Sequence, residues 1–167
     1  MKKMTEENLR AAFAGESQAH MKYTLFAEEA QKGGRANIAR LFRAVAYAER
    51  VHAANHLKAL GEIGTGSENL RTAIGGETFE VEEMYPAYLN VAKLQDEKGA
   101  QRSMNWALET EKIHAGLYEQ ARQAEESGTD VSLGDIHICS VCGYTVEGEP
   151  PDKCPLCGVS KKEFKSF

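Results

Sequence analysis

Long apolar runs and clusters of basic residues are missing from this chain of 167 residues. No stretch approaches the roughly eighteen consecutive apolar residues of a membrane-spanning helix, and the polar opening MKKMTEENLR does not resemble a signal peptide. A net charge of −5 without a Lys/Arg run gives no support to binding of nucleic acid or of a membrane surface. We therefore expect a globular, cytoplasmic protein with no nucleic-acid and no membrane partner.

Proline and cysteine are scarce, and their placement divides the chain. Only Pro86 precedes Pro150, and all four cysteines fall between positions 139 and 157. The segment SGTDVSLGD, at 127–135, separates the two regimes as a natural linker. We predict three parts: a helical domain over 1–128, a linker over 129–136 and a small cysteine-rich domain over 137–167.

Glycine-containing breaks outline four long helices in the first part. KGG at 32–34 ends the first, GEIGTG at 61–66 ends the second, and Ser127-Gly128 ends the fourth. Thr5 and Ser67 are suitable N-caps for the first and third helices. Helices of this number and length predict a four-helix bundle. Pro86 should kink the third helix, near 67–98, or free a carbonyl group one turn before it.

The helical part contains an internal repeat. AFAGES at 12–17 resembles AIGGET at 73–78, and AYAERVH at 46–52 resembles ALETEKIH at 107–114. The equivalent glutamates are 33 residues apart in the first pair of helices and 34 apart in the second. The two halves are therefore similar helical hairpins with pseudo-twofold symmetry.

Each of the four helices carries acidic or imidazole side chains on an otherwise apolar face. A single such glutamate has an ordinary explanation, because a long side chain can reach solvent from the edge of a core. Five carboxylates that converge in one core repel one another strongly unless they are protonated or neutralised by cations. A Glu from each of two helices plus Glu-x-x-His from each of the others is the ligand pattern of di-iron carboxylate proteins. The candidate ligands are Glu16, Glu49, His52, Glu77, Glu80, Glu111 and His114.

Three other residues in this region receive more ordinary roles. His20 and His56 lie four residues after Glu16 and His52, but the second hairpin has no counterpart of either. We therefore assign them supporting or surface roles, and we assign Trp106 to the core.

The cysteines form two knuckles, Cys139-x-x-Cys142 and Cys154-x-x-Cys157, which predict a tetrahedral thiolate metal site. Zinc is the commoner occupant of the bare pattern, as in a zinc ribbon. Tyr144, the CPLCG motif and the neighbouring redox iron favour a single iron instead. The glycine after each knuckle lets backbone N–H groups approach the sulfurs, which tunes the potential of an iron ion.

Together these motifs resemble the rubrerythrin family over essentially the whole chain. The resemblance implies a mainly α, ferritin-like four-helix bundle that holds two iron ions, followed by a rubredoxin-like domain with one iron on the four cysteines. The family's two active-site tyrosines match Tyr23 and Tyr85. In the family, one iron moves between a Glu when oxidised and a His when reduced. The matching residues here are Glu80 and His52.

The resemblance implies a peroxidase that reduces hydrogen peroxide to water in oxidative stress defence. Electrons would come from an external reductase or rubredoxin, ultimately from NAD(P)H, through the rubredoxin-like iron. Two other classes remain open: a ferroxidase or iron-handling protein, and a non-catalytic metal scaffold with a zinc ribbon. The cysteine domain argues against iron storage, which needs no electron relay.

The connector between the second and third helices is short for such a bundle. The repeat makes these helices parallel, so the chain must return about 27 Å along the axis, at about 1.5 Å per residue. GEIGTG reaches only about 20 Å when fully extended. We therefore expect a homodimer in which the subunits exchange hairpins, a domain swap.

Overall fold

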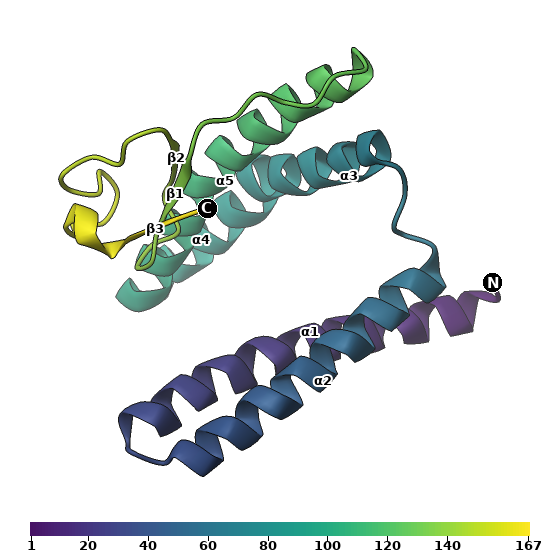
Figure 1. Cartoon of the computed structure of the whole chain (residues 1–167), viewed down its shortest axis with the longest axis horizontal. Coiled ribbons are helices and arrows are strands. Elements are labelled where there is room, and N and C mark those ends of the chain that lie inside the picture. Colours follow the sequence, from purple (N-terminus) through teal and green to yellow (C-terminus); the bar gives the residue numbers. More distant parts are fainter. The chain divides into compact units, whose positions relative to one another are not determined.

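The computed structural model describes all 167 residues, which are mostly helical and divide into two units, Met1–Gly64 and Thr65–Phe167. The first unit is a hairpin of helices α1 (Lys3–Lys32) and α2 (Ala36–Leu60), shown in purple and blue in Figure 1. None of the helices combines the length and the apolar character that crossing a bilayer requires.

Small residues form the fully buried part of the contact between α1 and α2. The buried residues of this unit are all alanines: Ala27, Ala39, Ala46 and Ala53. Two helices cannot enclose large side chains on every side, so several large apolar side chains of the hairpin remain about half exposed or more. Examples are Leu25, Phe26, Ile38 and Leu41.

The second unit begins with three consecutive helical segments that pack against a long helix. The segments are α3 (Gly66–Phe79), the π-helical turn η1 (Glu80–Met84) and α4 (Tyr85–Leu94), and the long helix is α5 (Lys98–Glu126). The predicted third helix is therefore interrupted. Pro86 is the second residue of α4, and α4 begins directly after the π-helical turn. A proline ring clashes with the carbonyl group four residues earlier, and the wider π turn accommodates that clash.

Two predicted helix caps are wrong. Thr5 lies inside α1, where no side chain caps the helix. The cap of α3 is Thr65 rather than Ser67: the Thr65 hydroxyl accepts from the backbone N–H of Glu68, and the Glu68 carboxylate accepts from the Thr65 N–H at 2.7 Å. The physical reason is the sequence T-x-x-E at 65–68, a capping box, whereas Leu70 stands three residues after Ser67.

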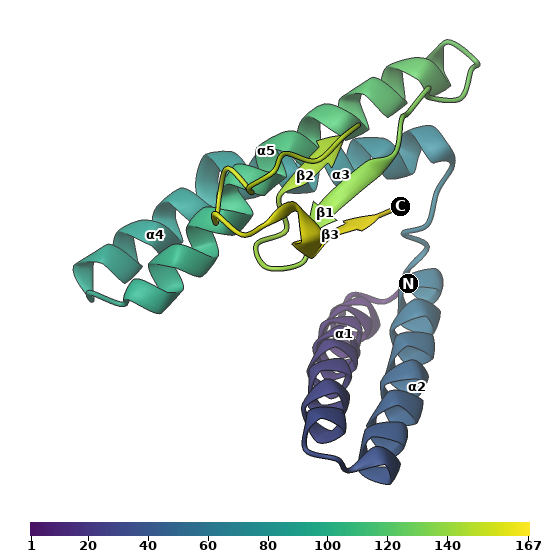
Figure 2. The same ribbon diagram turned by 60° about the vertical axis from the view of Figure 1, so that its left-hand side comes forward.

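A small three-stranded antiparallel sheet ends the second unit. Its order is β2 (Thr145–Glu147), β1 (Ile136–Cys139) and β3 (Phe164–Ser166). The sheet lies beside α5 in both views (Figures 1 and 2), and Trp106 of α5 packs against its cysteine core. The cysteine domain is therefore in direct contact with the helix that carries Glu111 and His114.

Candidate metal centres

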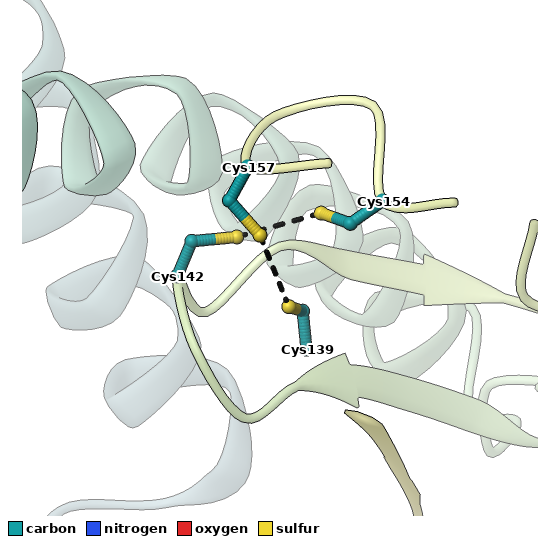
Figure 3. A group of neighbouring side chains, drawn as sticks. All are labelled: Cys139, Cys142, Cys154 and Cys157. Carbon is teal, nitrogen blue, oxygen red and sulfur yellow. Dashed lines mark hydrogen bonds between the residues drawn. The ribbon is translucent and has the colours of Figure 1, made fainter. Parts of the chain in front are cut away.

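The four cysteine sulfurs converge on one point (Figure 3). Sγ–Sγ distances are 3.6 Å for Cys139–Cys157 and 3.5 Å for Cys142–Cys154. These distances exceed the roughly 2.05 Å of a disulfide. They lie close to the edge of about 3.8 Å expected for a tetrahedron with metal–sulfur bonds of about 2.3 Å. All four thiols are free, so the arrangement fits a single tetrahedral metal ion.

Glycine conformation brings backbone N–H groups to the sulfurs. Gly143 and Gly158, which follow the two knuckles, have φ values of +82° and +81°, in the left-handed region that side chains disfavour. The next residues, Tyr144 and Val159, donate backbone hydrogen bonds to the sulfurs two positions before them. This is the approach of N–H groups that the glycines predicted.

Burial and backbone hydrogen bonds act in opposite directions on the thiols. Burial disfavours ionisation of Cys154, but hydrogen bonds from the backbone N–H groups of Cys157 and Leu156 and from the thiols of Cys142 and Cys157 together lower its pKa to about 7. Burial raises the pKa of Cys142, and the neighbouring thiols add to that rise. A cation at the centre would hold all four groups as thiolates.

In the first unit, α1 and α2 bring Glu16, Glu49 and His52 together. Their potential ligand atoms all lie within 4.8 Å of one another. Nδ1 of His52 is 2.9 Å from Oε2 of Glu49, because residues three apart share a helix face. The group offers two carboxylates and one imidazole, a donor set that suits iron or manganese.

In the second unit, α3 and α5 bring Glu77, Glu111 and His114 together in the same way. Their potential ligand atoms also lie within 4.8 Å of one another, and Nδ1 of His114 is 2.7 Å from Oε2 of Glu111. The internal repeat of the sequence is therefore a repeat of geometry, with one Glu-Glu-His group in each unit.

Comparisons with known proteins match both parts of the chain. The family model described as Rubrerythrin matches residues 7–122, and that described as Rubrerythrin, rubredoxin-like domain matches residues 137–165. This chain belongs to the rubrerythrin family. It is 43% identical to Rubrerythrin-2 of Clostridium acetobutylicum, over 98% of this chain and 97% of that protein. It is 35% identical to Nigerythrin of Nitratidesulfovibrio vulgaris, over 98% of this chain and 86% of that protein.

Solved structures of rubrerythrin-family members agree with this membership. The structure described as the fully reduced, all-ferrous state of nigerythrin has a TM-score of 0.56 and 34% identity, over 98% of this chain and 86% of that one. The predicted fold class is confirmed, as are the predicted cofactors: a di-iron domain with Glu/His ligand groups and a four-cysteine rubredoxin-like site. Membership of the rubrerythrin family implies an oxidoreductase of the peroxidase type.

Negative charge accumulates around the second Glu-Glu-His group. Burial raises the pKa of Glu77 to about 7, assisted by a hydrogen bond with Glu111 and by the charges of Glu111 and Glu80. Burial also raises the pKa of Glu80, which lies outside the three-residue group but close enough to feel Glu111 and His114. The pKa of Tyr85 rises through burial first and then through the charge of Glu80. Cations bound in this rubrerythrin-family site would offset the mutual repulsion of these carboxylates.

Two other predicted residues of the first unit, Tyr23 and His20, make contacts outside its Glu-Glu-His group. Tyr23 follows Glu16 by two turns of α1 and packs its ring against Phe26 and Phe42, with centroids 6.2 and 6.0 Å away. His20 donates from Nδ1 to the carbonyl oxygen of Ala46 at 2.8 Å, which ties α1 to α2. This bond gives His20 a supporting role.

Two residues join the cysteine domain to α5: Trp106, which the sequence predicted only as a core residue, and Thr145, which the sequence did not single out. Trp106 covers the cysteine core, with the Arg102 guanidinium 5.6 Å from its ring. The Thr145 hydroxyl of β2 lies 2.8 Å from Nε2 of His114. A cavity of about 390 Å³ between α5 and the domain is lined by Trp106, His114 and Thr145, among others. The only tryptophan of the chain is an evident candidate for a buried contact, whereas nothing in the sequence marks a single threonine in a strand as a partner of His114.

Proposed function

We propose that this protein reduces hydrogen peroxide to water, with electrons relayed through the rubredoxin-like site from an external reductase or rubredoxin that draws on NAD(P)H. One observation carries the proposal: a single chain combines two Glu-Glu-His groups with a four-thiolate site. When two ferrous ions are bound, they supply the two electrons that splitting the O–O bond requires. The proposed ligands are Glu16, Glu49, His52, Glu77, Glu80, Glu111 and His114 for the pair, and Cys139, Cys142, Cys154 and Cys157 for the relay ion.

Two tyrosines of the chain are proposed to position peroxide through hydrogen bonds. Tyr23 and Tyr85 are proposed to donate hydrogen bonds to the glutamate ligands or to peroxide. Burial and nearby carboxylates keep the Tyr85 hydroxyl protonated, because they raise its pKa. Glu80 and His52 are proposed to alternate at one metal position, with His52 bound in the reduced state.

We further propose that two copies of the chain exchange hairpins. The first unit buries only alanines and exposes large apolar side chains, so its hairpin requires another helical surface. The connector Gly61–Thr65 is short, and each unit holds one Glu-Glu-His group. A second copy supplies both the missing surface and the missing ligands.

The remaining proposals concern location and domain limits. Four free thiols grouped at a metal site suit a reducing compartment, which supports a cytoplasmic location. We propose the domain limits 1–128, 129–136 and 137–167.

Anaerobic reduction followed by stopped-flow mixing tests the peroxidase activity. The reduced protein should be oxidised faster by hydrogen peroxide than by oxygen, at a stoichiometry of one peroxide per two ferrous ions of the pair. Faster oxidation by oxygen would instead favour the ferroxidase alternative. The variant Cys154→Ser is the matched control, because it should keep the single turnover of a chemically reduced pair and lose steady-state turnover with NAD(P)H and a reductase.

A further inference from the structure

We propose that Thr145 is a positioning residue of the di-iron site, which keeps a proton on Nε2 of His114 and so reserves Nδ1 for the metal. The proposal rests on the assignment of His114 as an iron ligand under the proposed function. Thr145 belongs to the cysteine domain and not to the helical bundle. It would therefore act on the di-iron site from another domain.

The hydrogen on Nε2 of His114 follows from the hydrogen-bond partners of the buried Thr145 hydroxyl. Thr145 is only 3% exposed, and its Oγ1 lies 3.0 Å from the carbonyl oxygen of Gly143 and 2.8 Å from Nε2 of His114. A carbonyl oxygen only accepts, so the single hydroxyl proton of Thr145 goes to Gly143. The oxygen of Thr145 then accepts from His114, and Nε2 must carry a hydrogen.

The other ring nitrogen faces the metal group. Nδ1 of His114 lies 2.7 Å from the Glu111 carboxylate, which belongs to the same Glu-Glu-His group. A metal ion that binds here displaces any proton on Nδ1 to solvent, while the N–H at Nε2 stays with Thr145. Partners of this kind, beyond the ligands, fix the ring orientation of ligating histidines.

The equivalent histidine of the repeat lacks such an anchor. His52 has the same spacing from its glutamate and a similar Nδ1–Oε2 distance of 2.9 Å, but its own unit, Met1–Gly64, contains no counterpart of Thr145 or of the cysteine domain. Within the two units, therefore, only His114 is held by a residue of the cysteine domain.

The test uses the full-length protein loaded with Zn²⁺, a diamagnetic probe, and nitrogen NMR of the histidine rings. Wild-type protein should show metal on Nδ1 of His114 and a slowly exchanging hydrogen on Nε2. Thr145→Val should speed exchange of that hydrogen at least tenfold, and the affinity of the second Glu-Glu-His group for Zn²⁺ should fall about 10- to 100-fold. Thr145→Ser, which keeps the hydroxyl, should restore both properties.

Thr110→Val is the matched control. Thr110 is also 3% exposed and lines the same cavity, but its hydroxyl donates to the Trp106 carbonyl oxygen and not to His114. Thr145→Ala removes the hydroxyl without adding bulk, and the red colour of the ferric cysteine site in iron-loaded samples reports that the domain is folded.

An unchanged His114 ring in folded Thr145→Val and Thr145→Ala would overturn the proposal, as would equal loss in Thr110→Val. The NMR measurement needs no peroxide. A wild-type protein with the expected ring pattern but no peroxide reduction would refute the proposed function and support this inference.

Discussion

At the scale of single residues, the crowded carboxylates of the second Glu-Glu-His group make ionisation of Glu77 unfavourable. Burial and the neighbouring carboxylates raise the pKa of Glu77 to about 7, well above its usual 4.5. In the metal-free protein, folded Glu77 therefore keeps a proton that the unfolded chain has lost. The unfolded state binds fewer protons, so the free energy of unfolding should fall as pH rises from about 4.5 to 7 and then level off.

Denaturant unfolding of the metal-free protein across this pH range tests whether the free energy of unfolding falls as pH rises. Glu77→Gln should reduce the slope by up to about one proton, because a neutral amide has nothing to titrate. Glu83→Gln, which changes an exposed glutamate of η1, is the matched control and should leave the slope in place. A slope that survives Glu77→Gln would show that another group titrates.

At the scale of elements, the sequence predicted the features that depend on neighbouring residues. It did not predict the contacts that form when the cysteine domain packs on α5. The bounds of α2 agree with its glycine breaks, and the Glu-x-x-His spacing placed each histidine beside its glutamate. Apolar periodicity could not show that the third helix contains a π turn, because one inserted residue leaves the pattern nearly intact. The contact of Thr145 with His114 spans 31 residues and depends on how the cysteine domain packs on α5. No local pattern predicts such a contact.

The two cysteine loops depend on left-handed glycines, which gives a prediction at the same scale. A Cβ at Gly158 would meet nothing within 4 Å, so only its φ of +81° makes alanine unfavourable there. Gly158→Ala should cost about 1–2 kcal/mol in the denaturant unfolding of the iron-loaded cysteine site, followed by its visible absorption. Gly116→Ala, inside α5 and equally free of steric contact, should instead be neutral or stabilise by about 0.5–1 kcal/mol. Equal effects would mean that backbone conformation is not the cause.

At the scale of the whole molecule, the two Glu-Glu-His groups raise the question of which copies of the chain complete one di-iron site. Glu49→Ala disables the group of the first unit, and Glu111→Ala disables that of the second. Each variant alone should lose tight iron binding at every site, whatever the assembly. Co-expression with two different affinity tags isolates the mixed dimer.

With exchanged hairpins, the mixed dimer contains one site with two defects and one site with none. It should therefore bind one iron pair per dimer and regain about half of the wild-type peroxide reduction. Without exchange, each site of the mixed dimer keeps one defect, and neither iron binding nor activity returns. The comparison needs no high-resolution structure, because two defects can restore one intact site only if each site draws its halves from different chains. Mixed dimers as inactive as their parents would show that each chain builds its own site.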